Sequence, residues 1–214
     1  MDWTAYYDAQ AGRAVRSVLL ATLRLRGDAE AGVALDMGSG DGVETRHLLS
    51  LGWRVHSYDA DPVARERLTT GLDPGALSRL SFSSAQFEEL TGLPEADFVY
   101  AGFSLPFCAP SAFPGLWDAI RSAVKPGGLF AGELFGPHDS WGSRTDMNFH
   151  DREQVAGLLA GLGVLSLVEE DREGQSAFGP RHWHVFHVIA RNPPAPAWPG
   201  AHPEQPPKAE VLSV

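Results

Sequence analysis

Three residues near the start of the chain, Gly38, Ser39 and Gly40, form a glycine-rich turn that closely follows the apolar run 33–35. Glycine lets the backbone bend sharply and approach a ligand closely, because a side chain at either glycine position would obstruct it. Asp36 stands between the apolar run and the turn. This pattern is typical of several folds that bind nucleotides.

The residues after the turn favour a ligand without phosphates. A dinucleotide fingerprint needs a small residue at position 43, but Val43 stands there and the third glycine, Gly42, comes one position early. Asp41 lies where the next helix begins and would repel a phosphate that the positive helix end otherwise attracts. No Gly-Lys-Ser/Thr follows, so the phosphate-binding P-loop is missing as well. The pattern therefore favours a nucleoside.

Asp59 ends a second strand-like segment, 19 residues after Gly40. A carboxylate in this position can accept hydrogen bonds from both hydroxyls of a ribose. The alternative role is a helix N-cap, for which Asp61, directly before Pro62, is better placed.

Hydrophobic periodicity predicts the elements that position these residues. Helices are expected over 8–26, 43–51, 111–124 and 151–162 and from Asp61 onward, and strands over 33–35, 53–58, 80–83, 97–100, 129–135, 164–170 and 181–190. Strands that alternate with helices indicate a parallel sheet with helices on both faces. The last two strands have no helix between them and so predict an antiparallel pair. We expect an α/β fold with a seven-stranded, mostly parallel sheet.

The length of 214 residues suits one domain. We expect a single domain over 1–192, with an N-terminal helical cap (1–30), a cofactor-binding core (31–136) and a substrate-side helix and strand pair (137–192). Residues 193–214 are rich in proline, which predicts a flexible tail.

The net charge and the cysteine content indicate which cellular compartment and which binding partners to expect for the protein. The net charge is −10 and the 17 Lys and Arg residues are scattered, so nucleic acid is a disfavoured partner. Cys108 is the one cysteine, which fits a reducing compartment and is expected to be a buried, small apolar side chain. No secretory leader and no apolar stretch of membrane-spanning length is evident. We therefore expect a cytoplasmic protein without membrane contact; its oligomeric state is not indicated.

The segment Leu35–Gly42, Asp59, and Lys125–Gly128 before the fifth strand together resemble class I S-adenosylmethionine-dependent methyltransferases, over roughly residues 30–136. Tyr6-Tyr7, Phe103–Phe107 and His182–His184 are similar to a branch related to tellurite-resistance methyltransferases. The resemblance implies a Rossmann-like fold with S-adenosylmethionine as cofactor. It also implies methyl transfer to a small molecule or a metalloid oxyanion.

The resemblance assigns roles by position. Gly38, Ser39 and Gly40 would contact the methionine part of the cofactor, and Asp36 would orient their loop. Asp59 would bind the ribose, and Ala60 and Gln86-Phe87 would flank the adenine. Ala101, Gly102 and Phe103 would lie near the sulfonium, and Tyr6 and Tyr7 would close over the cofactor. Gln86 replaces the acid that the family often has, but its amide oxygen can still accept from the adenine amino group.

Methyl transfer from a sulfonium is an in-line displacement that needs alignment and exclusion of water, and no catalytic triad or metal is obligatory. Our candidates for contact with the reacting groups are His138, as an acid, base or substrate ligand, together with Phe103 and Tyr7. The segment Ala101–Ser104 lacks the Asn/Asp-Pro-Pro-aromatic signature of enzymes that methylate base or glutamine nitrogens. This points to a small-molecule acceptor.

Aromatic side chains around the expected site, namely Phe103, Phe107, Phe135 and Trp141, suggest an apolar pocket or, equally, part of the core. His182 and His184 share one face of a strand. Two histidines could begin a zinc site, but a third ligand is needed, and we expect no metal.

Two other functions remain open. An NAD(P)-dependent oxidoreductase on a related fold is disfavoured by Val43 and Asp41. A non-catalytic module could keep the S-adenosylmethionine site and have lost turnover.

Overall fold

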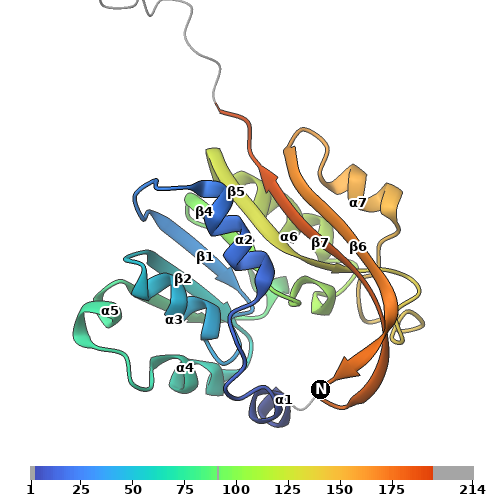
Figure 1. The fold of residues 1–214 in the computed structure, drawn as a ribbon, viewed down its shortest axis with the longest axis horizontal. Helices are drawn as coiled ribbons and strands as arrows, with labels where there is room; N and C mark the ends of the chain where they lie inside the picture. The colour runs from blue at the N-terminus through green and yellow to red at the C-terminus, as the bar shows by residue number, and fades with distance from the viewer. Residues whose placement is uncertain (1–2, 91, 195–214) are drawn as a thin grey trace, which may run out of the picture.

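The computed structural model describes residues 3–90 and 92–194. Its centre is a seven-stranded sheet in the order β3-β2-β1-β4-β5-β7-β6 (Figure 1). The strands are β1 (Val33–Met37), β2 (Arg54–Asp59), β3 (Leu80–Ser84), β4 (Ala96–Ala101), β5 (Val124–Phe135), β6 (Gly163–Ser176) and β7 (Gly179–Arg191). Strands β1 to β5 pair in parallel, whereas β7 pairs antiparallel with both β5 and β6. The predicted fold class is confirmed.

Helices cover both faces of this sheet. They are α1 (Trp3–Ala9), α2 (Ser17–Arg26), α3 (Val43–Ser50), α4 (Pro62–Thr69), α5 (Pro74–Ser78), α6 (Phe113–Ala123) and α7 (Arg152–Leu158). One buried apolar cluster joins α2 and α3 to the sheet, and a separate cluster joins α6 to it. In Figure 1, α2 lies in front of the sheet and α6 behind it. The strand order reverses between β1 and β4, so a crevice opens at their carboxyl ends.

The prediction of one helix over 8–26 is wrong, because α1 and α2 are separate helices. Gly12, in the turn that follows α1, has φ +76°, a left-handed conformation that does not continue a helix. Arg16, directly before α2, is extended. The segment between the helices can therefore turn its side chains toward the sheet.

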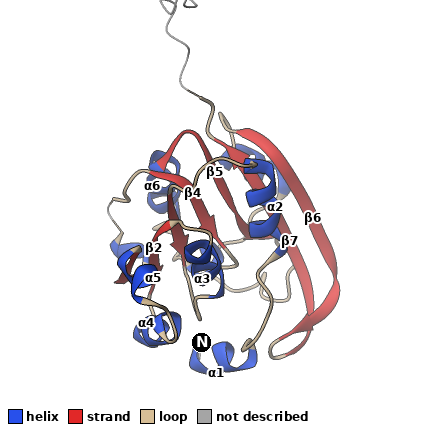
Figure 2. Cartoon of the chain, turned by 60° about the vertical axis from the view of Figure 1, so that its left-hand side comes forward, coloured by secondary structure: helices blue, strands red, loops and turns tan. Residues whose placement is uncertain are grey.

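The two C-terminal strands are longer than predicted, and the expected loop between them is a continuation of the ladder. Their pairing runs to Ser176 opposite Gly179. Residues 169–173 are all charged, so no apolar pattern predicts a strand there. Contacts of these residues with histidines on β7 stabilise this part of β6. At the tip, the ring of Phe178 lies 6.2 Å from that of Tyr6 on α1, and Figure 2 shows this long ribbon along the edge of the molecule.

Strand β5 also begins earlier than predicted, at Val124 rather than Leu129. The amide of Gly127 donates to Asn192 and continues the pairing with the end of β7. Of the predicted tail 193–214, residues 195–214 lie outside the described residues. Within the part of the chain that the structure describes, no helix combines the length and apolarity needed to cross a bilayer.

Candidate active site

The glycine turn after β1 is tightly packed. Gly38, Gly40 and Gly42 have φ angles of +77°, +54° and +80°, which L-residues with side chains rarely adopt. A side chain at Gly38 would collide with Ser104, and a Cβ atom at Gly42 would lie 2.7 Å from side-chain atoms of Leu68. The turn therefore requires glycine for both its conformation and its surroundings.

Asp59 ties the turn to the end of β2. Its Oδ2 accepts a hydrogen bond from the amide of Gly40 at 2.7 Å, and its Oδ1 accepts from the amide of Asp61 at 2.9 Å. The carboxylate is 8% exposed, and burial raises the pKa of Asp59 despite these hydrogen bonds. Asp61 caps α4 by accepting from Val63 at 2.9 Å, as predicted. Asp59 is thus held beside the turn, and the N-cap of α4 is Asp61 rather than Asp59.

Beneath the turn lies a second buried carboxylate, Asp36. It accepts a hydrogen bond from Thr45 Oγ1 at 2.6 Å. Burial raises the pKa of Asp36 to about 7, although this hydrogen bond opposes the shift. The side chain of Asp36 is thus bonded to α3, and its orienting role stays a prediction.

An ion pair that the sequence did not indicate joins the N-terminal segment to α3. Arg13 lies 2.6 and 2.5 Å from the two carboxylate oxygens of Glu44, and 3.3 Å from Asp41. The amide of Arg16 also donates to Glu44, at 3.1 Å. These partners are about thirty positions apart in the sequence, so spacing gave no signal for them.

A cavity of about 710 Å³ extends from this turn to the β6–β7 ribbon. The predicted residues that line it are Tyr6, Tyr7, Asp36, Gly38, Ser39, Gly40, Asp59, Ala60, Gln86, Phe87, Gly102 and Phe103. Ala101 is fully buried and His138 is exposed, and neither lines the cavity. The structure therefore brings twelve predicted residues together around one space and leaves two outside it.

The far half of the cavity is aromatic. Phe103, Phe107, Phe135 and Trp141 all line it, and Trp183 joins them. The Phe107 and Trp141 rings lie 6.0 Å apart, as do those of Phe103 and Trp183. The aromatic pocket predicted from the sequence is therefore present, although Trp183 was not among the expected residues.

A buried guanidinium stands among these rings. Arg181 lies 3.6 Å from the ring centroid of Trp141 and 4.2 Å from that of Trp183. Its Nη2 is 2.5 Å from Asp139, and the two side chains are 6% and 0% exposed. The Arg181 Nε is buried without a hydrogen-bond partner in the described parts of the chain. The guanidinium therefore keeps one donor without a partner in the described chain.

Phe103 has an unusual backbone conformation. Its φ of +56° is the one positive value of a non-glycine residue within 3–90 and 92–194. Such conformations carry strain and concentrate at functional sites. The guanidinium of Arg16 lies 4.5 Å from the Phe103 ring and makes no ion pair with a described residue. Phe103 thus stands between the two halves of the cavity under a second cationic group.

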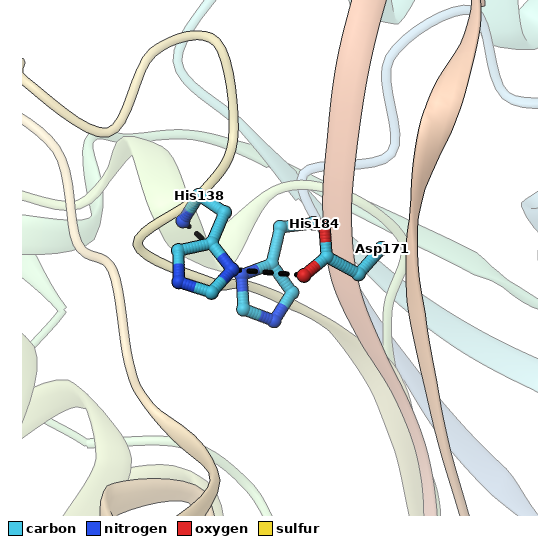
Figure 3. Close-up of side chains that lie close together, drawn as sticks. All are labelled: His138, Asp171 and His184. Atoms are coloured by element: carbon cyan, nitrogen blue, oxygen red, sulfur yellow. Dashed lines mark hydrogen bonds and ion pairs between the residues drawn. The ribbon is translucent and has the colours of Figure 1, made fainter.

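His138 lies on the outer side of the β6–β7 ribbon with Asp171 and His184 (Figure 3). Its Nδ1 is 2.8 Å from Asp171 Oδ2, and its side chain is 66% exposed. Cys108 is fully buried, as expected.

The reversed strand order at β1 and β4, the glycine turn and the acid at the end of β2 define the class I S-adenosylmethionine-dependent methyltransferase fold. Residues 34–128 match a family model described as methyltransferase domain. The resemblance in the sequence is thereby confirmed. Among curated protein sequences, none matches the chain.

Solved structures share this fold at low identity. TehB from Haemophilus influenzae is 15% identical with a TM-score of 0.70, and the match covers 88% of this chain and 66% of that one. The N-methyltransferase NodS from Bradyrhizobium japonicum WM9, solved with S-adenosyl-L-homocysteine, is 17% identical (TM-score 0.62; 88% and 98% covered). The 1,6-didemethyltoxoflavin-N1-methyltransferase of Burkholderia thailandensis is 22% identical (TM-score 0.61; 89% and 84% covered). This chain therefore spans just under two thirds of the length of the TehB chain.

Proposed function

We propose that this protein transfers a methyl group from S-adenosylmethionine to a small-molecule acceptor. The observation that carries the proposal is the single cavity of about 710 Å³, with the glycine turn and Asp59 at one end and aromatic side chains at the other. Its volume lies within the range of pockets for small ligands. Donor and acceptor can lie end to end in one such space, as in-line displacement requires.

The donor half is assigned to the cofactor. The turn from Gly38 to Gly40 holds the methionine part, Asp59 accepts hydrogen bonds from the ribose, and Phe87 packs against the adenine. The structures of NodS and of the toxoflavin methyltransferase both hold S-adenosylhomocysteine, which supports this ligand class. Gly102 and Phe103, directly after β4, stand beside the reacting methyl, and the ring of Tyr7 faces the sulfonium.

The acceptor half favours a flat or apolar molecule that carries an anionic oxygen group such as a carboxylate. Aromatic walls suit the apolar body. Arg181 and Arg16 both line the cavity and supply positive charge for the anionic group, and Arg16 has no ion pair in the described chain. A metalloid oxyanion is the second acceptor that the same positive charges suit. The toxoflavin methyltransferase likewise holds a small molecule, 1,6-didemethyltoxoflavin, beside S-adenosylhomocysteine.

Catalysis rests chiefly on alignment of the acceptor atom, methyl and sulfur. Where the acceptor arrives protonated, Glu170 is the carboxylate placed to take the proton, because it lines the aromatic half of the cavity. It lies 2.8 Å from Arg172 and 3.3 Å from His187 Nε2. His138 lies outside the cavity, so the proposal gives it no role in the reaction. A cytoplasmic location, suggested by the single cysteine, is part of the same proposal.

The decisive experiment is a calorimetric titration of S-adenosylhomocysteine into protein freed of copurified ligand. We expect saturable binding that Asp59→Ala weakens tenfold or more, about 1.4 kcal/mol. Asp61→Ala is the matched control, because it removes a neighbouring carboxylate that caps α4 and does not line the cavity. Binding of a nicotinamide dinucleotide in place of S-adenosylhomocysteine would reject the proposal in favour of an oxidoreductase. Tight donor binding without transfer to any acceptor would favour a non-catalytic module.

A further inference from the structure

The two faces of the β6–β7 ribbon carry different chemistry. The face toward the cavity presents Glu170, Arg172, Trp183 and Val185. The opposite face presents acids from β6 and histidines from β7: Glu169, Asp171, Glu173, His182 and His184. In register, Asp171 stands opposite His184 and Glu173 opposite His182. This second face plays no part in the proposed methyl transfer.

A third histidine joins this face from the turn after β5. His138 Nδ1 is 2.8 Å from Asp171 Oδ2, and the rings of His138 and His184 stack with centroids 4.7 Å apart. One potential ligand atom from each of His138, Asp171 and His184 lies within 4.8 Å of the others. Figure 3 shows the two rings stacked on one another with the Asp171 carboxylate beside them. Two separate segments of the chain thus supply three donors at one point.

The hydrogen bonds of His184 define its tautomer. Its Nδ1 accepts from the amide of His138 at 3.1 Å, so this nitrogen carries a lone pair directed into the cluster. Its Nε2 therefore carries the hydrogen and donates to Glu169 at 3.0 Å. A carboxylate behind a histidine is the arrangement that orients metal-ligating histidines and increases their basicity. His184 is also 3% exposed, and its ring packs against Gly136, which fixes its position.

We propose that His138, Asp171 and His184 bind one divalent transition-metal ion of the zinc type. Two imidazole nitrogens, one carboxylate oxygen and a water make a four-coordinate set that suits zinc. Zinc–ligand bonds of about 2.0–2.2 Å hold tetrahedral donors roughly 3.3 Å apart, so the exposed His138 side chain has to turn out of its stack on His184 to complete the site. His182 Nε2, 2.6 Å from the other oxygen of Asp171, orients the carboxylate.

Binding exchanges two hydrogen bonds for three metal bonds. His138 changes from its Nδ1–H to its Nε2–H tautomer by exchange with water, which frees Nδ1 for the ion, and the His138 amide gives up its acceptor on His184. Both groups belong to an exposed residue, so water can replace the lost partner. The surrounding acids Glu169, Asp171 and Glu173 outnumber the one nearby cation, Arg152, which favours a cation here. The proposal departs from the sequence-based expectation of no metal.

The ion would fasten the turn after β5 to the ribbon. The same turn carries Asp139, which pairs with Arg181, and Trp141, which lines the aromatic half of the cavity. A metal on the outer face therefore links this turn to the ribbon and holds the aromatic half of the cavity in place. Its role is structural, because the ligands lie across the ribbon from the cavity.

The test is a calorimetric titration of zinc chloride into the full chain after treatment with a chelator, in the absence of donor and acceptor. We expect one ion per chain with a Kd in the micromolar range or tighter, and a tenfold or greater weakening in His138→Ala and in Asp171→Asn. His47→Ala on α3 is the matched control and should bind as the wild type does. His138 is 66% exposed, so its replacement leaves folding intact.

Hydrogen exchange supplies an independent readout. Zinc should slow exchange over residues 137–142 in the wild type and leave His138→Ala unchanged. The proposal is overturned by absence of saturable binding, or by zinc affinity that His138→Ala and Asp171→Asn leave as in the wild type. Neither result bears on donor binding, because that site is tested with a different ligand.

Discussion

The hydroxyl of Tyr7 donates a hydrogen bond to Asp59 Oδ1 at 3.3 Å and so joins α1 to the end of β2. The Tyr7 ring also lies over the glycine turn, since a Cβ atom at Gly40 would be 3.2 Å from its Cε1. The helix that closes this end of the cavity is thus attached to the carboxylate proposed to hold the ribose. Burial and the neighbouring Asp59 raise the pKa of Tyr7, so its hydroxyl stays protonated and able to donate.

From this contact we expect the ring of Tyr7 to matter more than its hydroxyl. Tyr7→Phe should change the Kd for S-adenosylmethionine less than threefold, whereas Tyr7→Ala should raise it about five- to tenfold, roughly 1–1.4 kcal/mol. The loss in Tyr7→Ala should be smaller for S-adenosylhomocysteine, which lacks the positive sulfonium. Calorimetry on both ligands measures this; equal losses for the two would contradict a cation–π contact.

We expect Gly38→Ala to destabilise the protein more than its φ angle alone explains. Gly71 has a similar φ of +79° with nothing within 4 Å of an added Cβ, so Gly71→Ala measures backbone strain alone, about 1 kcal/mol. Gly38→Ala adds the collision with Ser104 and should cost at least about 1 kcal/mol more. Urea unfolding of both variants compares the two free energies. Equal costs would show that the turn relaxes around the added methyl group.

The buried pair Arg181–Asp139 should be far more sensitive than an exposed one. Asp139→Ala leaves Arg181 buried and unpaired, at an expected cost of about 3 kcal/mol in the free energy of unfolding. The exposed pair Arg144–Asp146 has a similar separation of 2.6 Å, and Asp146→Ala should cost less than about 0.5 kcal/mol. Adding Arg181→Met to Asp139→Ala should recover part of the loss. A double variant as unstable as the single one would indicate that packing, rather than unpaired charge, dominates.

Asp36 should make stability fall as pH rises. Its pKa of about 7 in the folded protein exceeds the value near 3.9 of an unfolded chain, so the folded state binds the proton more tightly. Between roughly pH 4 and pH 7, each unit of pH should therefore remove about 1 kcal/mol of stability relative to Asp36→Asn. Asparagine keeps an acceptor for Thr45 and cannot ionise. Unfolding of both proteins at several pH values in this window tests the slope, and parallel curves would contradict the assignment.

The alternation of strands and helices and the glycine turn could be predicted because they depend on local periodicity and on backbone conformations that one residue type allows. The sheet and most residues of the donor half follow from those signals. The break at Gly12 was missed, because a single glycine inside a helical pattern is usually tolerated. The pairing of Arg13 with Glu44 could not be predicted, since nothing in the spacing links the two segments.

The acceptor half was harder to predict for a related reason. Arg181 and Trp183 lie on a strand whose neighbours in sequence are polar, and only the pairing of β6 with β7 shows which face each side chain occupies. His138 was expected near the substrate because it follows the carboxyl end of β5. The turn after that strand instead carries it to the outer face of the ribbon, with Asp171 and His184.

The order in which the chain contributes to the cavity has a consequence for protein engineering. The donor end is built mainly from residues 36–87, whereas much of the aromatic end comes from 135–185. If the proposed function holds, a chimaera that takes the later stretch from another methyltransferase with this fold should change the acceptor and keep most of the donor end. One crossover point between α6 and β5 is then enough to exchange this stretch.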